Sequence, residues 1–353
     1  MPRHPTLQDL AKQLGVSRTT VSNAFNRPDQ LSEELRERIL SAARKLGYTG
    51  PNPVARMLRT GRAGAVGLLF SEPLTYAFDD PTTLAFLQGV GQVCARVQSS
   101  LLILPVVDNA NAVQTIQQAA VDGFIIYCLP DDSPVVAQVL ERRLPVVAVD
   151  QAIQGVPTVG IDDRQAARLA AEHLLALGHR RLGVLALDLQ ADDHFGPVAK
   201  ERRMTPNYRV TAQRLKGYEE ALGAAGIDLH SLPLWECPGN DSGRALEAAR
   251  NLLDTHPRPT GLLAMSDRLA LGVLEAARER GLEVPRDLSV VGFDDIALAS
   301  QLTPTLTTIH QPLVEKGVVT AELLLEGTGE ATSRQLEVQL VVRDSSGPPP
   351  TEG

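Results

Sequence analysis

The chain has 353 residues, of which 43% are apolar and 22% charged, and its net charge is −8. This length exceeds one ordinary hydrophobic core and predicts two or three domains. No apolar run is long enough to cross a bilayer and no export signal begins the chain, so we expect a cytoplasmic protein with no membrane partner. Cys94, Cys128 and Cys237 are widely spaced, which favours reduced thiols over a disulfide framework or a metal cluster.

Positive charge is concentrated at the N-terminal end. Residues 1–62 contain 11 Lys and Arg against 5 Asp and Glu, whereas residues 63–353 contain 23 against 37. A small basic segment on a large acidic body is typical of a terminal nucleic-acid-binding module. Charge alone does not distinguish such a module from a solvated basic end.

Three short helices are predicted within residues 1–50. Thr6 and Asp9 form a capping-box pattern before the first helix, and Ser17 and Ser32 are suited to cap the second and third. The first two, joined through GVS, match a helix-turn-helix. Apolar positions at helical spacing predict one shared core, formed by Leu7, Leu10, Ala11, Leu14, Val21, Ala24, Phe25, Leu35, Ile39, Ala42 and Leu46.

The second of these helices, RTTVSNAFN, carries the predicted contacts to base edges in the major groove. Arg18 can bind guanine through two hydrogen bonds, and Asn23 can do the same with adenine. Hydroxyl side chains nearby are suited to phosphate, although Thr20 and Ser22 are also suited to cap or solvate the helix. The predicted DNA-binding residues of this domain are Thr6, Ser17, Arg18, Thr19, Thr20, Ser22, Asn23 and Asn26.

Residues 51–62 combine a linker composition with a helix start. Asn52 is a good helix cap and Pro53 suits the first helical position. The segment PVARMLR spans only about two turns, too short for an isolated helix, so we expect it to fold when paired with its twin on DNA. Its predicted DNA contacts are Ala55, Arg56, Leu58 and Arg59, with Leu58 shaped to enter between base steps.

Residues 63–344 alternate between apolar runs and helical segments, which predicts two doubly wound α/β lobes with a cleft between them. The apolar runs are residues 65–70, 101–107, 123–129, 145–150, 182–188, 260–265 and 288–293. Helices are predicted at residues 83–97, 163–178, 211–226 and 267–281.

Ligands of open α/β sheets bind at the carboxyl ends of the strands, so the residues just past the apolar runs are site candidates. These are Ser71, Tyr127, Asp150, Asp188, Ser266, Asp267, Asp294 and Asp295. Ionised carboxylates accept hydrogen bonds from sugar hydroxyls, which favours a hydroxyl-rich ligand at Asp150 and Asp294. Asp267 and Asp295 precede or open helices, and there helix capping is the preferred interpretation.

A family is indicated by three segments of the sequence, TLQDLAKQLGVSRTTVSNAFN, LGY and PNPVARMLRTG. They resemble the lactose/galactose-repressor (LacI/GalR) family of bacterial transcription regulators, and the resemblance extends to about Arg343. It implies a helix-turn-helix head over residues 1–50, a hinge helix and linker over 51–62, and a two-lobed body over 63–344 that resembles periplasmic sugar-binding proteins. It also implies a homodimer on a pseudo-palindromic DNA operator, controlled by a small molecule.

The resemblance implies effector contacts as well. The segment RLKGY matches the family segment whose arginine faces the effector, here Arg214, and VVGFDD brings Asp294 to the same place. The segment AMSDRLALG differs, because Ser266 stands where the family often carries Asn. The complete predicted effector set is Ser71, Tyr127, Asp150, Arg214, Ser266 and Asp294.

The predicted effector is a carbohydrate, and the alternative is a purine or nucleoside stacked on an aromatic ring. Candidate rings are Phe78, Phe86, Tyr127, Phe195, Tyr208 and Trp235. The sequence lacks the glycine-rich phosphate motifs and the G-x-S-x-G motif of enzymes with related folds, so no catalytic site, cofactor or metal is predicted. A sugar receptor for transport would need an export signal. A binding protein without DNA function would leave the basic head unexplained, so a repressor is the predicted function.

Three further segments are interpreted here, the first two of them with two alternatives each. Residues 189–213 are longer than an ordinary connection and form either a lid over the cleft or a disordered insertion. The apolar face of Leu84, Leu87, Val90 and Cys94 is either a dimer interface or buried against its own sheet. Residues 345–353 (SSGPPPTEG) are polar and proline-rich and are predicted to be disordered.

Overall fold

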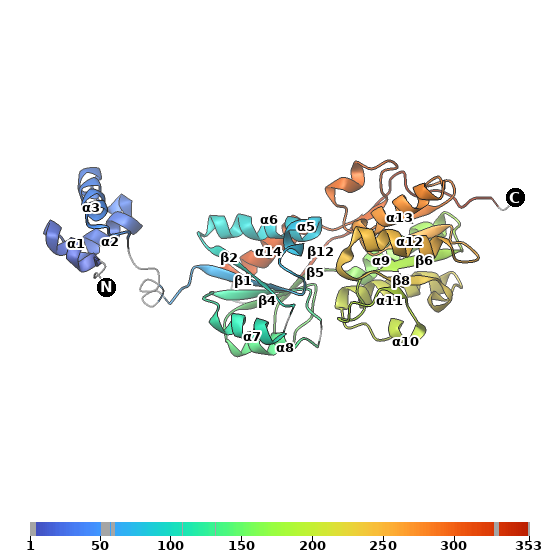
Figure 1. The fold of residues 1–353 in the computed structure, drawn as a ribbon, viewed down its shortest axis with the longest axis horizontal. Helices are drawn as coiled ribbons and strands as arrows, with labels where there is room; N and C mark the ends of the chain where they lie inside the picture. The colour runs from blue at the N-terminus through green and yellow to red at the C-terminus, as the bar shows by residue number, and fades with distance from the viewer. Residues whose placement is uncertain are drawn as a thin grey trace. The chain divides into compact units, whose positions relative to one another are not determined.

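The computed structural model describes residues 5–50, 57, 61–107, 109–130, 132–327 and 332–351. The chain divides into two compact units, a head of residues 1–64 and a body of residues 65–353. Figure 1 colours the head blue and the two lobes of the body from light blue to red. Among the described residues, no helix combines the length and the apolarity that a membrane span requires.

The head contains the three predicted helices, and their caps form as the sequence indicates. Thr6 and Asp9 make the reciprocal capping box of α1, and Gly15 ends that helix in the left-handed region. Ser17 accepts from the Thr20 backbone N–H at the start of α2, and Ser32 caps α3 in the same way. The bounds are α1 Leu7–Leu14, α2 Arg18–Asn26, η1 Pro28–Gln30 and α3 Glu33–Leu46.

One small core holds the head together. Its buried residues are Leu10, Ala11, Val21, Ala24, Ile39, Ala43 and Tyr48. Ala43 and Tyr48 were not predicted, whereas Leu7, Leu14, Phe25, Leu35, Ala42 and Leu46 pack partly buried around this core. Tyr48 meets Phe25 edge-on, with ring centroids 5.6 Å apart, and so closes the core on the side where the head ends.

The first lobe is a six-stranded parallel sheet in the order β12-β5-β4-β3-β1-β2. Helices α6 and α14 bury apolar side chains on one face, and α7 and α8 on the other. The bounds are β1 Ala65–Phe70, α5 Tyr76–Asp79, α6 Pro81–Arg96, β2 Ser100–Pro105, α7 Asn109–Gln118, β3 Gly123–Tyr127, α8 Pro134–Glu141, β4 Val146–Val149, β5 Thr158–Ile161, α14 Leu313–Leu325 and β12 Arg334–Leu336.

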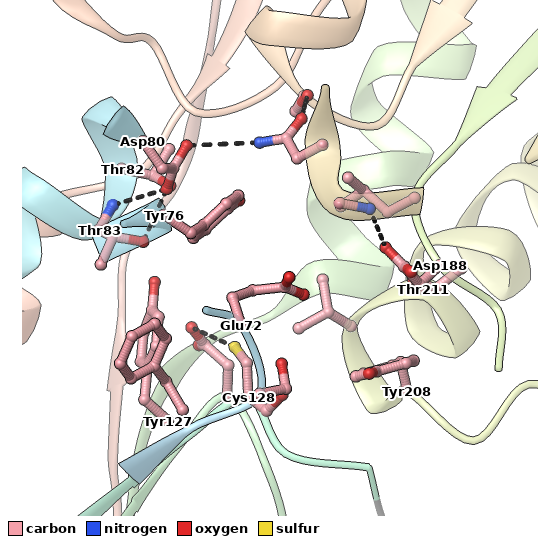
Figure 2. A pocket seen from close by; sticks show the side chains of 18 of the residues that line it. Glu72, Tyr76, Asp80, Thr82, Thr83, Tyr127, Cys128, Asp188, Tyr208 and Thr211 are labelled. Atoms are coloured by element: carbon pink, nitrogen blue, oxygen red, sulfur yellow. Dashed lines mark hydrogen bonds between the residues drawn. The ribbon is translucent and has the colours of Figure 1, made fainter. Parts of the chain in front are cut away.

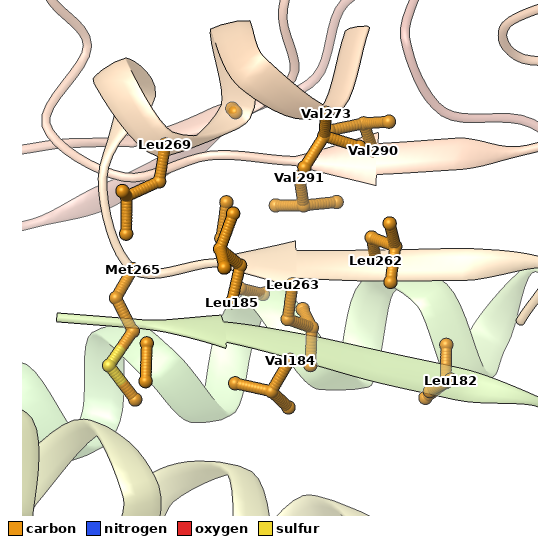
Figure 3. Packing of buried hydrophobic residues seen from close by; sticks show 14 of the residues in the cluster. Leu182, Val184, Leu185, Leu262, Leu263, Met265, Leu269, Val273, Val290 and Val291 are labelled. Carbon is orange, nitrogen blue, oxygen red and sulfur yellow. The ribbon is translucent and has the colours of Figure 1, made fainter. Parts of the chain in front are cut away.

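The second lobe is a five-stranded sheet in the order β10-β9-β6-β8-β7, parallel except at β7. Leu269 and Val273 of α13 pack over this sheet (Figure 3). The bounds are α9 Asp163–Ala176, β6 Leu182–Ala186, β7 Gly196–Pro197, α10 Lys200–Arg203, α11 Arg209–Ala224, η2 Leu229–Ser231, β8 Leu234–Glu236, η3 Pro238–Asn240, α12 Ser242–Leu253, β9 Gly261–Ala264, α13 Asp267–Glu279, β10 Ser289–Val291 and η4 Ala297–Ser300.

The chain passes between the lobes at three places, so neither lobe is one continuous segment (Figure 1). It crosses between β5 and α9, returns before α14, and crosses again after β12. β11 (Thr308–His310) and β13 (Gln339–Val341) pair antiparallel at these crossings and pack against α9. The doubly wound two-lobed body predicted from the alternating pattern is therefore confirmed.

The prediction that residues 345–353 are disordered is wrong for the part that the structure describes. Ser345 is fully buried, and its hydroxyl donates to the Val290 carbonyl and accepts from the Thr307 backbone N–H. The His179 ring bonds the Gly347 carbonyl at 2.9 Å. The polar composition that suggests disorder instead supplies hydroxyls that satisfy backbone groups at the edge of the second lobe.

Residues 189–213 are ordered, so the disordered alternative for this insertion is wrong. They contain β7, α10 and the start of α11. Arg202 anchors the segment, because its guanidinium bonds both the buried Glu236 carboxylate and Asp192. The segment is thus an extension of the second lobe, and its end reaches the site described below.

The apolar face of α6 is interpreted either as a dimer interface or as a face buried against its own sheet, and its four residues differ in burial. Val90 and Cys94 are buried in the first lobe, Leu87 is partly buried against the same cluster, and Leu84 is 42% exposed.

α6 lies very close to α14: a Cβ added at Gly89 would lie 2.0 Å from the Val314 carbonyl oxygen, and one at Gly317 would lie 2.1 Å from that of Phe86. This contact fixes α14 against α6.

Replacing Ser345 with Ala tests the ordered C-terminal segment. The change leaves the Thr307 N–H buried without its acceptor, so we expect the free energy of unfolding of the body to fall by about 1–3 kcal/mol. Urea unfolding measures it, and Thr351→Ala at an exposed position is the matched control. A disordered segment would give no difference between the two variants.

Candidate functional site

A cavity of about 150 Å³ lies between the two lobes of the body, at the carboxyl ends of their strands. All six residues of the predicted effector set line it, although they come from separate segments of the chain: Ser71, Tyr127, Asp150, Arg214, Ser266 and Asp294. The lining also includes Glu72, Tyr76, Asp80, Thr83, Cys128, Asp188, Tyr208, Arg209, Thr211, Asn240 and Gln311. Figure 2 shows Glu72 projecting into the middle of this pocket.

The wall from the first lobe is built at the ends of β3 and β4. Tyr127 ends β3 and stacks on Phe86 of α6, with ring centroids 4.7 Å apart. Asp150 follows β4 with a φ of 54°, a left-handed conformation that few non-glycine residues adopt. Its two carboxylate oxygens accept from Lys316 Nζ at 3.0 and 2.8 Å. Lys316 therefore balances the charge of Asp150 from behind the pocket wall.

The wall from the second lobe is built around Arg214 of α11. Its Nε donates to Asp163 at 2.9 Å, Nη1 donates to the Met265 carbonyl, and the guanidinium lies 3.5 Å from the ring centroid of Phe293. Asp294 directly follows Phe293, has a φ of 111°, and accepts a hydrogen bond from Gln311 Nε2 at 2.7 Å. Burial raises the pKa of Asp294, and the Arg214 charge opposes that rise.

A hydrogen-bond chain crosses the cleft at the start of α6. The buried Asp80 caps α6 by accepting from the Thr83 N–H and hydroxyl, at 2.8 and 2.7 Å. Asn240 of the second lobe donates to the other Asp80 oxygen at 3.4 Å and accepts from the Ser266 hydroxyl. Arg268 lies 3.6 Å from the same carboxylate. These contacts join the lobes on one side of the pocket.

Two carboxyl groups of the pocket have pKa values above the usual range of a carboxyl group. Burial, with Asp188 and other carboxylates nearby, raises the pKa of Glu72 to about 7. Burial likewise raises the pKa of Asp188 to about 6, although that group accepts from the Gly239 backbone N–H. Glu72 follows β1 and Asp188 follows β6, so a group bound between them would contact carboxylates from both lobes.

The interpretation of Asp267 and Asp295 as helix caps is wrong. Ser266 caps α13 through the Leu269 N–H, while the buried Asp267 accepts from Thr308 and from the Ile296 N–H, outside the helix that it opens. Asp295 bonds His310 and Arg343. Thr308 and His310 lie on β11 and Arg343 follows β13, so these partners are distant in sequence and the local pattern at a helix start does not reveal them.

The head places several predicted DNA-binding side chains in local contacts. Arg18 and Thr19 are exposed at the start of α2. Asn23 donates to Gln30 at 3.0 Å, and Asn26 donates to the Ser22 carbonyl. The other three stand in caps, namely Thr6, Ser17 and Thr20. The predicted contacts at Ala55, Arg56, Leu58 and Arg59 lie outside the described residues.

Comparison with known proteins places these two units in one family. The pattern described as "Bacterial regulatory proteins, lacI family" matches residues 6–52, and that of a periplasmic binding protein-like domain matches residues 171–346. The chain is 45% identical over 354 residues to the HTH-type transcriptional regulator Rv3575c of Mycobacterium tuberculosis, covering 98% of each. The chain belongs to the LacI family. It is therefore a DNA-binding transcriptional regulator, and its relatives are regulators rather than enzymes.

Solved structures of LacI-family proteins share the whole architecture. The complex of the transcriptional regulator CelR with cellobiose is 29% identical, with a TM-score of 0.69, and the match covers 97% of this chain and 99% of that one. The lac repressor dimer bound to operator and the anti-inducer ONPF is 25% identical, with a TM-score of 0.77, covering 98% and 100%. The predicted family and fold are thus confirmed.

Sequence reasoning missed part of this LacI-family pocket. Glu72 directly follows the predicted Ser71, so the strand-end rule would have found it one residue further on. Asn240 and Gln311 come from short connections, and Lys316 comes from a helix, where no strand-end pattern marks them. Of the six candidate aromatic rings, Tyr127 and Tyr208 line the pocket, Phe86 supports Tyr127, Phe195 packs on Trp235, and Phe78 is exposed.

Replacing Glu72 with Gln tests the charge of the pocket without a ligand. A carboxyl whose pKa is raised by folding destabilises the folded state once it ionises, so stability is lost as pH rises from about 4.5 through about 7. We expect Glu72→Gln to be more stable than the natural protein by about 1–3 kcal/mol at pH 8 and nearly equal at pH 5.

Thermal unfolding at the two pH values measures this difference, and Glu201→Gln at an exposed position of α10 is the control. An equal shift at pH 5 and pH 8 would contradict the assignment, because it would not depend on ionisation.

Proposed function

We propose that this regulator is a repressor that binds a pseudo-palindromic operator as a homodimer and is controlled by a small carbohydrate bound between its lobes. The observation that carries the effector class is the pocket lining, which presents carboxyl groups from both lobes: Glu72, Asp80, Asp150, Asp188 and Asp294. Hydroxyl groups are uncharged and donate hydrogen bonds to such acceptors, and a sugar carries several of them.

The same lining disfavours an anionic effector. Arg214 lines the pocket, but its charge is already balanced by Asp163 at 2.9 Å. Arg209 is the other cation of the lining and lies at the exposed start of α11. A phosphate group would therefore meet more negative than positive charge, so an uncharged sugar fits better than its phosphate ester.

The relatives support this class, since CelR is described in complex with cellobiose. The alternative effector is a purine or nucleoside, for which Tyr127 and Tyr208 would supply stacking surfaces. One face of Tyr127 is already covered by Phe86. Because the carboxyl groups outnumber these two rings in the lining, we favour the carbohydrate.

The DNA-binding part of the proposal rests on the head. One helix-turn-helix covers a half-site, so two heads on an inverted repeat are needed for high affinity, as in the operator complex of the lac repressor dimer. Arg18 and Thr19 at the exposed start of α2 would contact base edges. Arg56, Leu58 and Arg59 of residues 51–62 would contact the backbone and minor groove.

The body offers a physical route from the pocket toward the head. β1 is the strand that follows the head in sequence, and it ends at Phe70, directly before Ser71 and Glu72 of the pocket. A ligand that changes how the lobes close would also shift the start of β1 and with it the two hinges of the dimer. Such coupling amounts to about 1–3 kcal/mol in typical allosteric proteins.

Selection of duplexes from a random library tests the DNA proposal. We expect an inverted repeat to be enriched, and we expect Arg18→Ala to weaken its binding by about 1–3 kcal/mol. Arg286→Ala, at an exposed position of the body, serves as the control. A salt series without preference for the selected repeat over random DNA would refute sequence-specific binding.

Calorimetric titration with uncharged sugars and their phosphate esters tests the effector proposal. D-ribose, D-glucose, D-galactose and cellobiose cover the size range, and we expect at least one to bind while ribose 5-phosphate and glucose 6-phosphate do not. Asp294→Asn should weaken sugar binding about 10–100-fold, because the amide puts an NH₂ donor in the place of one carboxyl oxygen. Glu219→Gln on α11 is the exposed control. Binding of adenosine or guanine alone would favour the alternative.

A further inference from the structure

We propose that Lys316, which lies outside the pocket lining, is the positioning residue that holds Asp150 and Asp294 as hydrogen-bond acceptors of the pocket. This inference rests on the proposed function, because it concerns how that pocket selects ligand groups that donate hydrogen bonds. The strand-end pattern does not mark this lysine, since it lies in the first turn of helix α14, between Glu315 and Gly317.

Every donor of the Lys316 ammonium has a partner. The side chain is 1% exposed, and Nζ donates to both Asp150 oxygens at 3.0 and 2.8 Å and to Gln311 Oε1 at 2.7 Å. A buried ammonium is stable only when it is paired and its hydrogens are satisfied. Since Lys316 keeps no donor for the ligand, it acts on the ligand through these two residues.

The orientation of the Gln311 amide follows from this contact. An ammonium donates and cannot accept, so the amide oxygen must face Lys316. The amide nitrogen then faces the other way, where it donates to Asp294 Oδ1 at 2.7 Å. Without Lys316 either end of the amide could face Asp294, and only the nitrogen can donate to its carboxyl oxygens.

One cation thereby orients a carboxylate on each side of the cleft. Asp150 belongs to the first lobe and contacts Lys316 directly, whereas Asp294 follows β10 of the second lobe and is reached through Gln311. Both backbones lie in the left-handed region, with φ of 54° and 111°. Lys316 is held in place because the adjoining Gly317 packs on α6 without room for a side chain.

The consequence is a requirement on the ligand. The remaining lone pairs of Asp150 and Asp294 accept hydrogen bonds, whereas the Lys316 ammonium keeps no donor and the Gln311 amide turns its nitrogen, not its oxygen, toward Asp294. A sugar hydroxyl satisfies this wall by donating, whereas a methyl ether or a ring nitrogen acceptor at the same place leaves it unpaired. Discrimination between ligand groups that donate hydrogen bonds and those that only accept them thus comes from Lys316, a residue that does not contact the ligand.

The first part of the test needs no ligand. ¹⁵N NMR of the full chain labelled at lysine side chains reports which ammonium groups are protected from exchange with water. We expect one protected ammonium at pH 7 that is absent from Lys316→Met and retained in Lys216→Met, a matched change at an exposed position of α11. A spectrum without a protected ammonium, or one unchanged by Lys316→Met, would overturn the inference.

The second part measures, at pH 7, the affinity for whichever of D-ribose, D-glucose, D-galactose and cellobiose binds the natural protein, and for the mono-O-methyl ethers of that sugar. We expect Lys316→Met to lose about 10–100-fold in sugar affinity, and to lose the preference of the natural protein for the sugar over these ethers, because nothing then fixes the Asp150 carboxylate and the Gln311 amide. The double variant Lys316→Met/Asp150→Asn leaves no unpaired buried carboxylate at this place and should show the same loss of preference.

An equal loss of affinity for the sugar and for its methyl ethers, which leaves the preference unchanged, would overturn the inference, because it would indicate a merely structural role. If none of the four sugars binds the natural protein, the proposed effector class fails, and the NMR result still decides whether Lys316 organises this wall.

Discussion

The body of this protein depends on the pairing of charges buried at the boundary between its lobes. Arg214 and Lys316 are 4% and 1% exposed, and each is held by a carboxylate, Asp163 and Asp150 respectively. Removing one member of such a pair leaves an uncompensated buried charge and is strongly destabilising. The pairs fix the positions of the pocket side chains before any ligand arrives, so the pocket is preorganised.

The residues of this network also belong to the connections between the lobes. Asp163 opens α9 just after the first crossing, and Gln311 lies at the second, between β11 and α14. Asp80 and Asn240 add a contact across the other side of the cleft. A ligand that bonds Asp150 and Asp294 therefore acts on segments whose geometry sets how the lobes close. It can shift the equilibrium only as far as its affinities for the two arrangements differ.

The parts of this structure predicted from the sequence are those governed by local rules. Thr6, Ser17 and Ser32 cap helices because short polar side chains satisfy free N–H groups, and the run at 65–70 forms β1 because it is continuously apolar. Strand-end positions placed Asp150 and Asp294 in one pocket. Lys316, Asn240 and Ser345 could not be found in this way, because their partners are distant in sequence and meet them only after folding.

We propose that the pocket between the lobes and the DNA-binding head are energetically coupled. The most direct test is calorimetric titration of the sugar that binds the natural protein, into free protein and into its complex with the selected inverted repeat, at one salt concentration. Reciprocity predicts that the two sugar affinities differ by the factor by which the sugar changes operator affinity, about 5–150-fold. Equal affinities for free and operator-bound protein would contradict the claim.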